Sequence, residues 1–276
     1  MKLNLGLCQM KGSVHKEESL RRAEELVRRA ARDGAQLAVL PEMFNCPYET
    51  SCFPRYAEPA GGPTWQMLSH LARELGIYLV GGSVPEEEAG RIYNTSYIFS
   101  PSGAELARHR KVHLFDINVP GGQVFQESET LTAGDQVTVV DTEFGRIGVA
   151  ICFDIRFSEL FRLMCQQGAR LIVVPAAFNM TTGPVHWELA FRMRALDSQC
   201  FVAGCSPARD ETASYVAYGH SLACNPWGTV LTDLGEREAV QVVTLDLDEI
   251  DQYRAQLPIL AGRRTDLYRT ELLPRP

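Results

Sequence analysis

A buried strand that runs directly toward a helix, with a cysteine at the junction, places the strongest limit on how this chain can fold. Arg146 to Ile151 is a short apolar run rich in β-branched residues, typical of a buried strand, and it stops at Cys152. From Leu160 apolar residues recur at helical spacing until Gly168. Such a turn exposes a side chain above a sheet edge, beside free backbone N–H groups, where a nucleophile is needed. The alternative is that Cys152 is an ordinary buried cysteine.

Composition indicates one packed domain. The chain has 276 residues, of which 45% are hydrophobic and 22% charged, and no linker-like stretch divides it. The net charge of −7 argues against nucleic acid as a partner. No apolar run approaches transmembrane length, so we expect a soluble, cytoplasmic protein with no membrane partner. The eight cysteines include no C-x-x-C pair, which favours reduced thiols over a metal site or disulfides.

Helix and strand patterns alternate early in the chain, and hairpins enter between them. We expect helices over 15–33, 64–75, 156–167 and 186–199. We expect strands over 2–9, 36–40, 77–84, 93–100, 104–110, 146–151, 171–175, 201–205, 220–224, 229–234 and 240–246. Residues 43–63 and 112–135 are expected to be loops, and the tail from Asp248 begins as a helix. This order indicates a layered α/β sandwich with mixed sheets.

Three charged residues share one feature with Cys152: each follows the end of an expected strand or lies in the loop before one. Glu42 follows an apolar strand, Lys111 follows the strand that ends at Arg110, and Glu127 lies in the long loop that precedes Asp135. Taken singly, each is more simply a solvated surface charge. Where strands of one sheet end at one edge, however, such side chains can converge on a crevice.

The four residue types suit nucleophilic attack on a carbonyl. A thiol must lose its proton to attack, and a buried carboxylate such as Glu42 can accept that proton as a general base. The Lys111 ammonium can favour the thiolate and donate to a developing oxyanion, with the backbone N–H of Phe153 as the second donor. Glu127 would then keep Lys111 charged and orient it.

A cysteine–histidine pair is the alternative, because His113 lies two residues beyond Lys111. If the preceding strand continued, we would expect the alternation of side chains to turn His113 away from the crevice that Lys111 faces. We therefore interpret His113 as structural. Asp154, Arg156 and Glu159 are expected to stabilise the turn after the cysteine.

Three segments resemble the signature sequences of the nitrilase superfamily of carbon–nitrogen hydrolases: residues 40–44, 110–114 and 148–157. Their order and spacing fit residues 3–247, which implies one hydrolase domain followed by a tail at 248–276. The resemblance implies a four-layer αββα sandwich with two mixed β-sheets and a Glu42–Lys111–Cys152 triad, with Glu127 as a second glutamate. It also implies a homodimer, and a reaction through a thioester that needs no metal or organic cofactor.

Residues 44–48, 111–117, 125–128 and 178–188 are most similar to the omega-amidase branch of that superfamily. This implies hydrolysis of the terminal amide of 2-oxoglutaramate and 2-oxosuccinamate. Five residues are candidates for binding the substrate, mainly at its far end: Tyr48, Arg156, Phe178, Thr181 and Thr182. Deaminated-glutathione amidases share the segment around 182–188, so that activity and N-carbamoyl amine hydrolysis remain alternatives. An inactive scaffold or binding protein on the same fold is the alternative outside enzymes.

Overall fold

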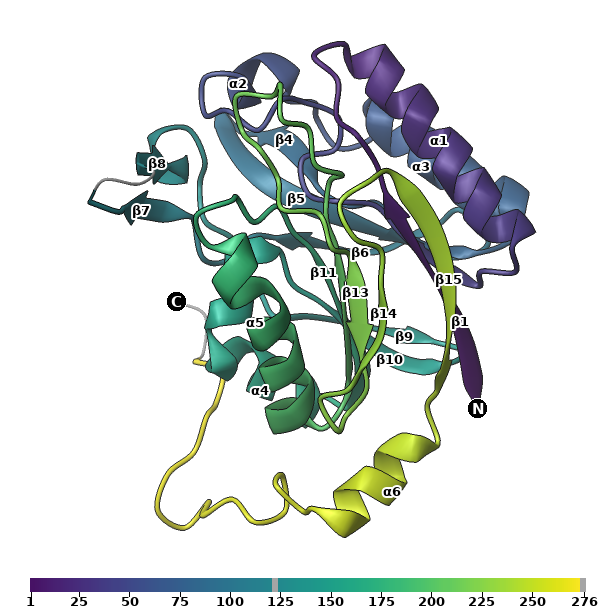
Figure 1. The fold of residues 1–276 in the computed structure, drawn as a ribbon, viewed down its shortest axis with the longest axis vertical. Coiled ribbons are helices and arrows are strands. Elements are labelled where there is room, and N and C mark those ends of the chain that lie inside the picture. The colour runs from purple at the N-terminus through teal and green to yellow at the C-terminus, as the bar shows by residue number, and fades with distance from the viewer. Residues whose placement is uncertain (121–123, 274–276) are drawn as a thin grey trace.

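Two mixed β-sheets packed face to face form the centre of the molecule, which a computed structural model describes over residues 1–120 and 124–273 (Figure 1). The first sheet has the strand order β15-β1-β2-β3-β5-β4, with β6 paired to β5. Its strands are β1 (Lys2–Gln9), β2 (Leu37–Val39), β3 (Tyr78–Val80), β4 (Val84–Glu88), β5 (Arg91–Phe99), β6 (Glu105–Arg110) and β15 (Ala239–Asp246). β1, β2 and β3 are parallel and the remaining pairs are antiparallel.

The second sheet has the order β14-β13-β12-β11-β10-β9, in which β10, β11 and β12 are parallel. Its strands are β9 (Thr138–Thr142), β10 (Gly145–Val149), β11 (Ala169–Pro175), β12 (Phe201–Cys205), β13 (Leu222–Cys224) and β14 (Val230–Asp233). Alternation along β11 places Leu171 and Val173 between the two sheets, whereas Ile172 and Val174 face the helices. The central apolar layer is therefore built from both sheets.

Two helices cover the outer face of each sheet, which confirms the predicted αββα sandwich (Figure 1). α1 (Lys16–Arg32) and α3 (Pro63–Leu75) cover the first sheet, and α4 (Ser158–Gln166) and α5 (Gly183–Ser198) cover the second. A side chain at Gly204 on β12 would lie 2.4 Å from the Phe191 ring, so glycine is what lets α5 approach this closely.

Two predictions about the connections are wrong. The expected strand 77–84 is two strands, because the chain turns at Gly82 with a φ of 55° between β3 and β4. The segment 112–135 is not a plain loop: it holds a short hairpin of β7 (Asp116–Asn118) and β8 (Val124–Gln126), then the 3₁₀ turn η1 (Glu127–Glu129). This hairpin projects from the body of the sandwich (Figure 1). The short helix α2 (Phe53–Tyr56) lies within the expected loop 43–63.

The chain after β15 forms α6 (Glu249–Gln256) and then continues without regular structure. Ile250 of α6 is fully buried in the layer between the sheets, so the start of the tail is part of the core. Residues 274–276 of the predicted tail lie outside the described residues. In the described ranges, no helix combines the length and the apolar character that a membrane crossing requires.

Candidate active site

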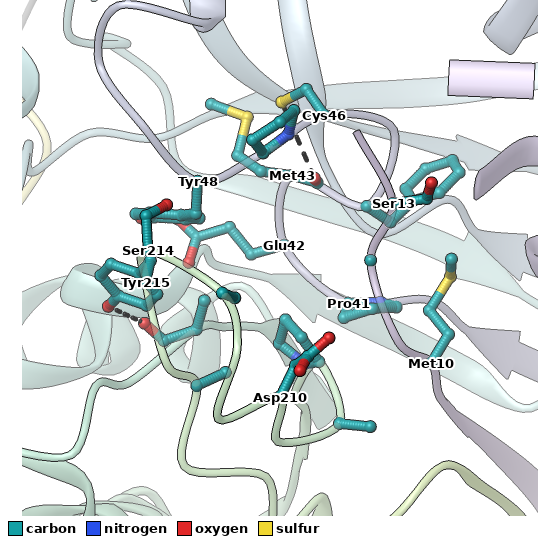
Figure 2. Close-up of a pocket in the computed structure, with 18 of the residues that line it drawn as sticks. Met10, Ser13, Pro41, Glu42, Met43, Cys46, Tyr48, Asp210, Ser214 and Tyr215 are labelled. Carbon is teal, nitrogen blue, oxygen red and sulfur yellow. Dashed lines mark hydrogen bonds between the residues drawn. The ribbon is translucent and has the colours of Figure 1, made fainter. Parts of the chain in front are cut away.

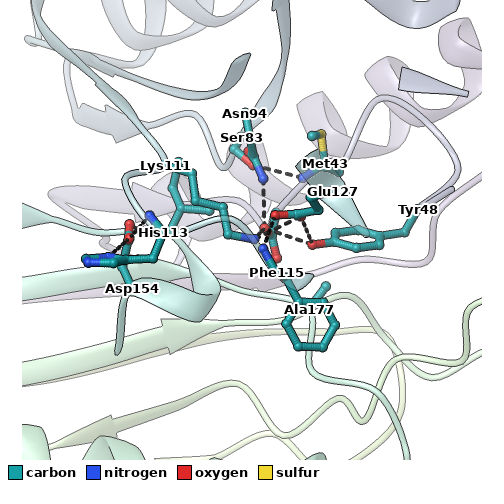
Figure 3. Close-up of polar contacts among 12 residues, drawn as sticks. Met43, Tyr48, Ser83, Asn94, Lys111, His113, Phe115, Glu127, Asp154 and Ala177 are labelled. Carbon is teal, nitrogen blue, oxygen red and sulfur yellow. Dashed lines mark hydrogen bonds and ion pairs between the residues drawn. The ribbon is translucent and has the colours of Figure 1, made fainter. Parts of the chain in front are cut away.

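A lysine between two glutamates lies at the centre of the site, at the edge where β2 and β6 end (Figure 3). The Lys111 Nζ atom is 2.9 Å from Oε1 of Glu42 and 2.9 Å from Oε1 of Glu127. Lys111 and Glu127 are fully buried, and Glu42 is 1% exposed. The fold thus brings together three charged residues that are 69 and 16 positions apart in the sequence.

Two further polar groups contact the same carboxylates. The Tyr48 hydroxyl lies 3.0 Å from Glu42 Oε1 and 2.8 Å from Glu127 Oε1, opposite Lys111 in Figure 3. The Asn94 amide of β5 donates to Glu42 Oε1 at 2.8 Å. Glu127 is oriented through its other oxygen, which accepts the backbone N–H of Phe115 at 2.8 Å. Both carboxylates are therefore held by hydrogen bonds from several elements.

Cys152 opens the 3₁₀ turn η2 (Cys152–Arg156), three residues after β10 ends. Its backbone has a φ of 46°, in the left-handed region that a cysteine rarely adopts. Its thiol is buried and interacts with the Glu42 carboxyl. Such strain persists only where the surroundings hold it, and it is concentrated at functional sites.

Burial and neighbouring charges set the protonation states. Burial raises the pKa of Glu42; the Lys111 ammonium opposes this and the Glu127 carboxylate adds to it. Burial also raises the pKa of the Cys152 thiol, with Glu42 adding to the rise and Lys111 opposing it. For Lys111, burial would lower the pKa, but Glu127 and Glu42 raise it above its ordinary value. The resting thiol is therefore neutral and Lys111 is an ammonium, whereas burial disfavours the ionised form of Glu42.

Asp154 joins the cysteine turn to the segment that carries Lys111. Its Oδ2 accepts the backbone N–H of Ile151 at 3.0 Å and contacts Nε2 of His109 at 3.1 Å. Its Oδ1 accepts the backbone N–H of His113 at 2.9 Å and contacts the Nδ1 of that ring at 2.8 Å. Both oxygens of a fully buried carboxylate are thus occupied, and the turn is tied to both sides of Lys111.

His113 points away from Glu127 and toward Asp154, as Figure 3 shows. This direction agrees with our expectation, but the reason we gave is wrong. Residues two apart on a strand face the same side. The regular strand β6 ends at Arg110, and the bends at 112 and 113 turn His113 away from the side that Lys111 faces. His113 stacks on Phe157, with ring centroids 3.6 Å apart.

Comparison with known proteins agrees with this geometry. The sequence profile of the Carbon-nitrogen hydrolase family matches residues 4–255. This chain belongs to the carbon–nitrogen hydrolase family. It is 52% identical over 270 residues to Omega-amidase NIT2-A of Xenopus laevis, covering 98% of each chain. It is 50% identical over 268 residues to Omega-amidase NIT2 of Homo sapiens, covering 97% of each chain.

Among solved structures, the chain is similar to Saccharomyces cerevisiae Nit3, a member of branch 10 of the nitrilase superfamily. The TM-score is 0.88 at 41% sequence identity, over 95% of this chain and 97% of Nit3. The predicted membership of the nitrilase superfamily is therefore confirmed, and this hydrolase is an enzyme that acts on amides.

Arg156 lies at the end of η2, beside the cysteine, and its guanidinium has no carboxylate partner among the described residues. Its guanidinium lies 5.6 Å from the ring centroid of Phe153 and 5.0 Å from that of Phe178. Among the described residues, its guanidinium contacts Nδ1 of His186 at 3.4 Å. Within residues 1–120 and 124–273, no carboxylate pairs with Arg156, and its Nε atom is buried without a hydrogen bond.

The two threonine candidates have a local role in the structure. The backbone N–H groups of Thr181 and Thr182 donate to Oδ1 of Asn179 at 3.0 and 2.9 Å, and the Thr182 hydroxyl donates to the same oxygen at 3.2 Å. These bonds close the turn that leads into α5. The Thr182 hydroxyl therefore donates its proton to Asn179 within the turn of this hydrolase.

A cavity of about 460 Å³ adjoins the carboxylate cluster (Figure 2). Of the predicted site residues, Glu42 and Tyr48 line it, whereas Cys152 and Lys111 do not. Tyr215 forms part of the wall, stacked on Tyr48 with ring centroids 4.5 Å apart. The cavity thus reaches the cluster at Glu42 and Tyr48.

Sequence reasoning missed Asn94, Tyr215 and the bridging role of Asp154. One signal could have found Asn94: it begins a run of three polar residues, Asn94 to Ser96, within an otherwise apolar strand, and all three are fully buried. Polar residues in the middle of a buried strand need partners there. Nothing local to Tyr215 indicates that it packs on Tyr48, 167 positions earlier in the chain.

Proposed function

We propose that this chain is an omega-amidase that hydrolyses the terminal amide of small 2-oxo acid amides, 2-oxoglutaramate and 2-oxosuccinamate, to the 2-oxo dicarboxylate and ammonia. The main support is the buried Glu42–Lys111–Glu127 cluster beside the strained cysteine turn. The similarity to omega-amidases over nearly the whole chain supports the substrate class. We assign catalysis to the domain at 3–247, with 248–276 as a tail.

In the proposed first half-reaction, Glu42 accepts the proton of the Cys152 thiol as sulfur attacks the amide carbon. Three N–H or O–H donors contact Glu42 Oε1, whereas Oε2 has none in the described part of the chain. Oε2 is therefore the oxygen available to the thiol proton. The Lys111 ammonium and the Phe153 N–H, at the first turn of η2, donate to the oxyanion. Ammonia leaves with a proton returned by Glu42, and a thioester remains.

In the second half-reaction, Glu42 removes a proton from a water molecule that attacks the thioester. The acid product leaves and the Cys152 thiol is restored. Glu127 keeps its role throughout, because its Oε1 lies 2.9 Å from the Lys111 Nζ atom and its charge helps to keep the ammonium protonated. Besides the amide, each cycle consumes one water molecule, and Glu42 carries the transferred protons.

For the far end of the substrate, we propose Arg156 as the partner of the free carboxylate. It is a cation without a carboxylate partner among the described residues, and it lies over the Phe153 and Phe178 rings. Phe178 would pack against the carbon chain, and Tyr48 would lie near the amide. Thr181 and Thr182 would contribute through the shape of their turn. We propose a cytoplasmic location for the enzyme.

We also propose a homodimer formed through the outer helices. Val185, Leu189 and Met193 follow one face of α5 and are 62%, 67% and 44% exposed. Light scattering should report a mass twice that of the chain, and Leu189→Glu should lower it to that of the monomer.

The function is tested by ammonia release from 2-oxoglutaramate, glutamine and an N-carbamoyl amine. For deaminated glutathione, whose amide nitrogen leaves as a peptide amine, the release of 2-oxoglutarate is measured instead. We expect 2-oxoglutaramate to be the preferred substrate and Cys152→Ala to abolish its turnover. Mass spectrometry of rapidly quenched enzyme should detect the acyl group on the peptide that contains Cys152. Preference for a carbamoyl amine or for deaminated glutathione would contradict the proposed substrate. Turnover of none of the four would favour the inactive scaffold.

A further inference from the structure

Two cysteines far from the amidase machinery form a dithiol pair. The sulfur atoms of Cys165 and Cys200 lie 4.0 Å apart. Cys165 is in the last turn of α4, and Cys200 lies between α5 and β12. Cys200 is fully buried and Cys165 is 9% exposed, so Cys165 is the member of the pair nearer to solvent. Neither residue takes part in the proposed reaction of Cys152.

The surroundings make the two thiols chemically different. The contact with Cys200 lowers the pKa of Cys165; burial opposes this, whereas the Ser198 hydroxyl and the guanidinium groups of Arg162 and Arg254 add to it. The same contact, together with burial, raises the pKa of Cys200. Cys165 is therefore the member of the pair that loses its proton more readily.

The other buried cysteines lack this arrangement. Cys8 and Cys205 also neighbour one another, but both are fully buried, and burial raises the pKa of each. Burial likewise raises the pKa of Cys46 and Cys224. Cys46 has a neighbouring thiol, Cys52, and a nearby cation, Lys16, but burial raises its pKa. Among the described residues, Cys165 and Cys200 are the cysteines whose sulfur atoms contact one another directly.

We propose that Cys165 and Cys200 are a redox modification site, which a hydroperoxide converts into an intrachain disulfide. The Cys165 thiolate attacks one peroxide oxygen and breaks the O–O bond, giving a sulfenic acid and, after proton uptake, one water from hydrogen peroxide. The Cys200 sulfur then attacks the Cys165 sulfur and displaces hydroxide, which takes up the Cys200 thiol proton and leaves as a second water. Two thiols are oxidised by two electrons and one peroxide is reduced.

The disulfide would join the helical layer to the second sheet. It would tie the end of α4 to the start of β12, where Gln199 adopts a left-handed φ of 47°. Gln199 is itself bound by the tail, because its side chain bonds the backbone of Leu257 and Leu260. The sulfurs must approach from 4.0 Å to about 2.05 Å, a small movement for the last turn of a helix next to a loop.

The experiment uses the full chain with Cys152→Ala, so that the catalytic thiol is not the one oxidised. A small excess of hydrogen peroxide should remove about two thiols per chain, and dithiothreitol should restore them. Trypsin should then release peptide 163–170 joined to peptide 195–209, lighter by two hydrogen atoms than the reduced pair. Fragmentation distinguishes Cys200 from Cys205 within the second peptide.

Matched variants fix the assignment. Adding Cys165→Ser or Cys200→Ser should abolish the joined peptide, whereas Cys224→Ser, another buried cysteine, should leave it unchanged. A joined peptide through a different cysteine, or sulfinic acid at Cys165 with Cys200 still reduced, would overturn the proposal.

A second probe tests the spacing without oxidation. Phenylarsine oxide condenses with two adjacent thiols, forming two As–S bonds and releasing one water. We expect one arsenic per chain in the Cys152→Ala protein and none after either serine substitution at the pair. Absence of both the arsenical adduct and the disulfide would show that the two sulfurs cannot be bridged.

Discussion

Two buried carboxyl groups in this enzyme lie on opposite sides of Lys111 and have opposite electrostatic character. Asp154 and Glu42 are 0% and 1% exposed. Burial alone would raise the pKa of Asp154, but hydrogen bonds from His109 and His113 lower it well below its usual range. The pKa of Glu42 is raised, because burial and Glu127 outweigh the attraction of Lys111.

The difference lies in how the hydrogen bonds are distributed over the two oxygens of each carboxyl group. Both oxygens of Asp154 have partners, two of them backbone N–H groups, so its negative charge is fully compensated. Glu42 receives all its N–H and O–H donors on Oε1, and Oε2 has none in residues 1–120 and 124–273. Burial by itself does not identify a catalytic carboxyl group. Incomplete hydrogen bonding beside a thiol indicates a proton acceptor, and complete hydrogen bonding indicates a structural anchor.

The sharpest test makes the same change at both carboxyl groups, and its first half has the largest expected effect. Glu42→Gln keeps the shape but cannot accept a proton, so kcat/KM for 2-oxoglutaramate should fall by about 10⁴-fold. Its stability should stay the same or rise, because a carboxyl group with a raised pKa destabilises the folded chain when it is ionised. Ammonia release and urea unfolding measure the two quantities. A Glu42→Gln enzyme that keeps wild-type turnover would remove the proposed base.

Lys111 and His113 provide the second test, because they lie two residues apart and face different carboxyl groups. Lys111→Met removes an oxyanion donor and should lower kcat by about 10³-fold. His113→Asn, the control, should change kcat by less than about threefold, because His113 contacts Asp154 rather than the reacting groups. An inactive His113 variant beside an active Lys111 variant would favour a cysteine–histidine mechanism. Circular dichroism checks that both variants fold.

Which residues form the site could largely be anticipated from the sequence, because their positions depend on where strands end. The apolar runs before Glu42 and Cys152 mark strand ends. We expected these ends at the edge of one sheet, but β2 and β10 belong to different sheets, and the packing of the two sheets brings the ends together. Residue type then suggested the chemistry of the thiol, base and ammonium. The αββα layers followed from helical and strand periodicity together with the resemblance.

The partners of each carboxyl group could not be anticipated, because they come from distant segments. Asn94 reaches Glu42 across 52 positions, and His109 reaches Asp154 across 45. Such contacts depend on strand register. An error of one residue in the register turns every side chain of the strand to the opposite face of the sheet. The end of β6 at Arg110 was predicted, but the bends at 112 and 113 that set the direction of His113 were not, because no residue pattern near them reveals them.

Asp154→Asn is the second half of the matched test, and it should affect stability more than chemistry. It leaves His109, His113 and Ile151 with a weaker, neutral acceptor, so the free energy of unfolding in urea should fall by about 3 kcal/mol at pH 7. Turnover per folded molecule should fall by about tenfold, because the cysteine turn is less well held. The control Asp141→Asn, at an exposed carboxylate paired with Arg146, should leave unfolding unchanged.

The pH dependence of this effect has a definite sign. A carboxyl group with a lowered folded pKa stabilises the fold above its unfolded pKa of about 3.9, and that contribution is lost as the pH falls toward the folded value. The stability difference between wild type and Asp154→Asn should therefore be full at pH 7 and shrink below about pH 4. A difference that grows with acid would contradict the anchoring role.

The smallest expected effect changes the hydrogen bonding of Glu42 without removing it. Asn94→Ala deletes one donor to the ionised carboxylate, which should raise the pKa of Glu42 further. Activity requires Glu42 to be ionised, so the acid limb of the kcat/KM profile should move to higher pH by about 0.7, the equivalent of one hydrogen bond worth about 1 kcal/mol. Asn45→Ala, at a buried asparagine that bonds Thr64 instead, should leave the limb in place. A limb that stays fixed in Asn94→Ala, or moves to lower pH, would mean that another group limits activity in acid.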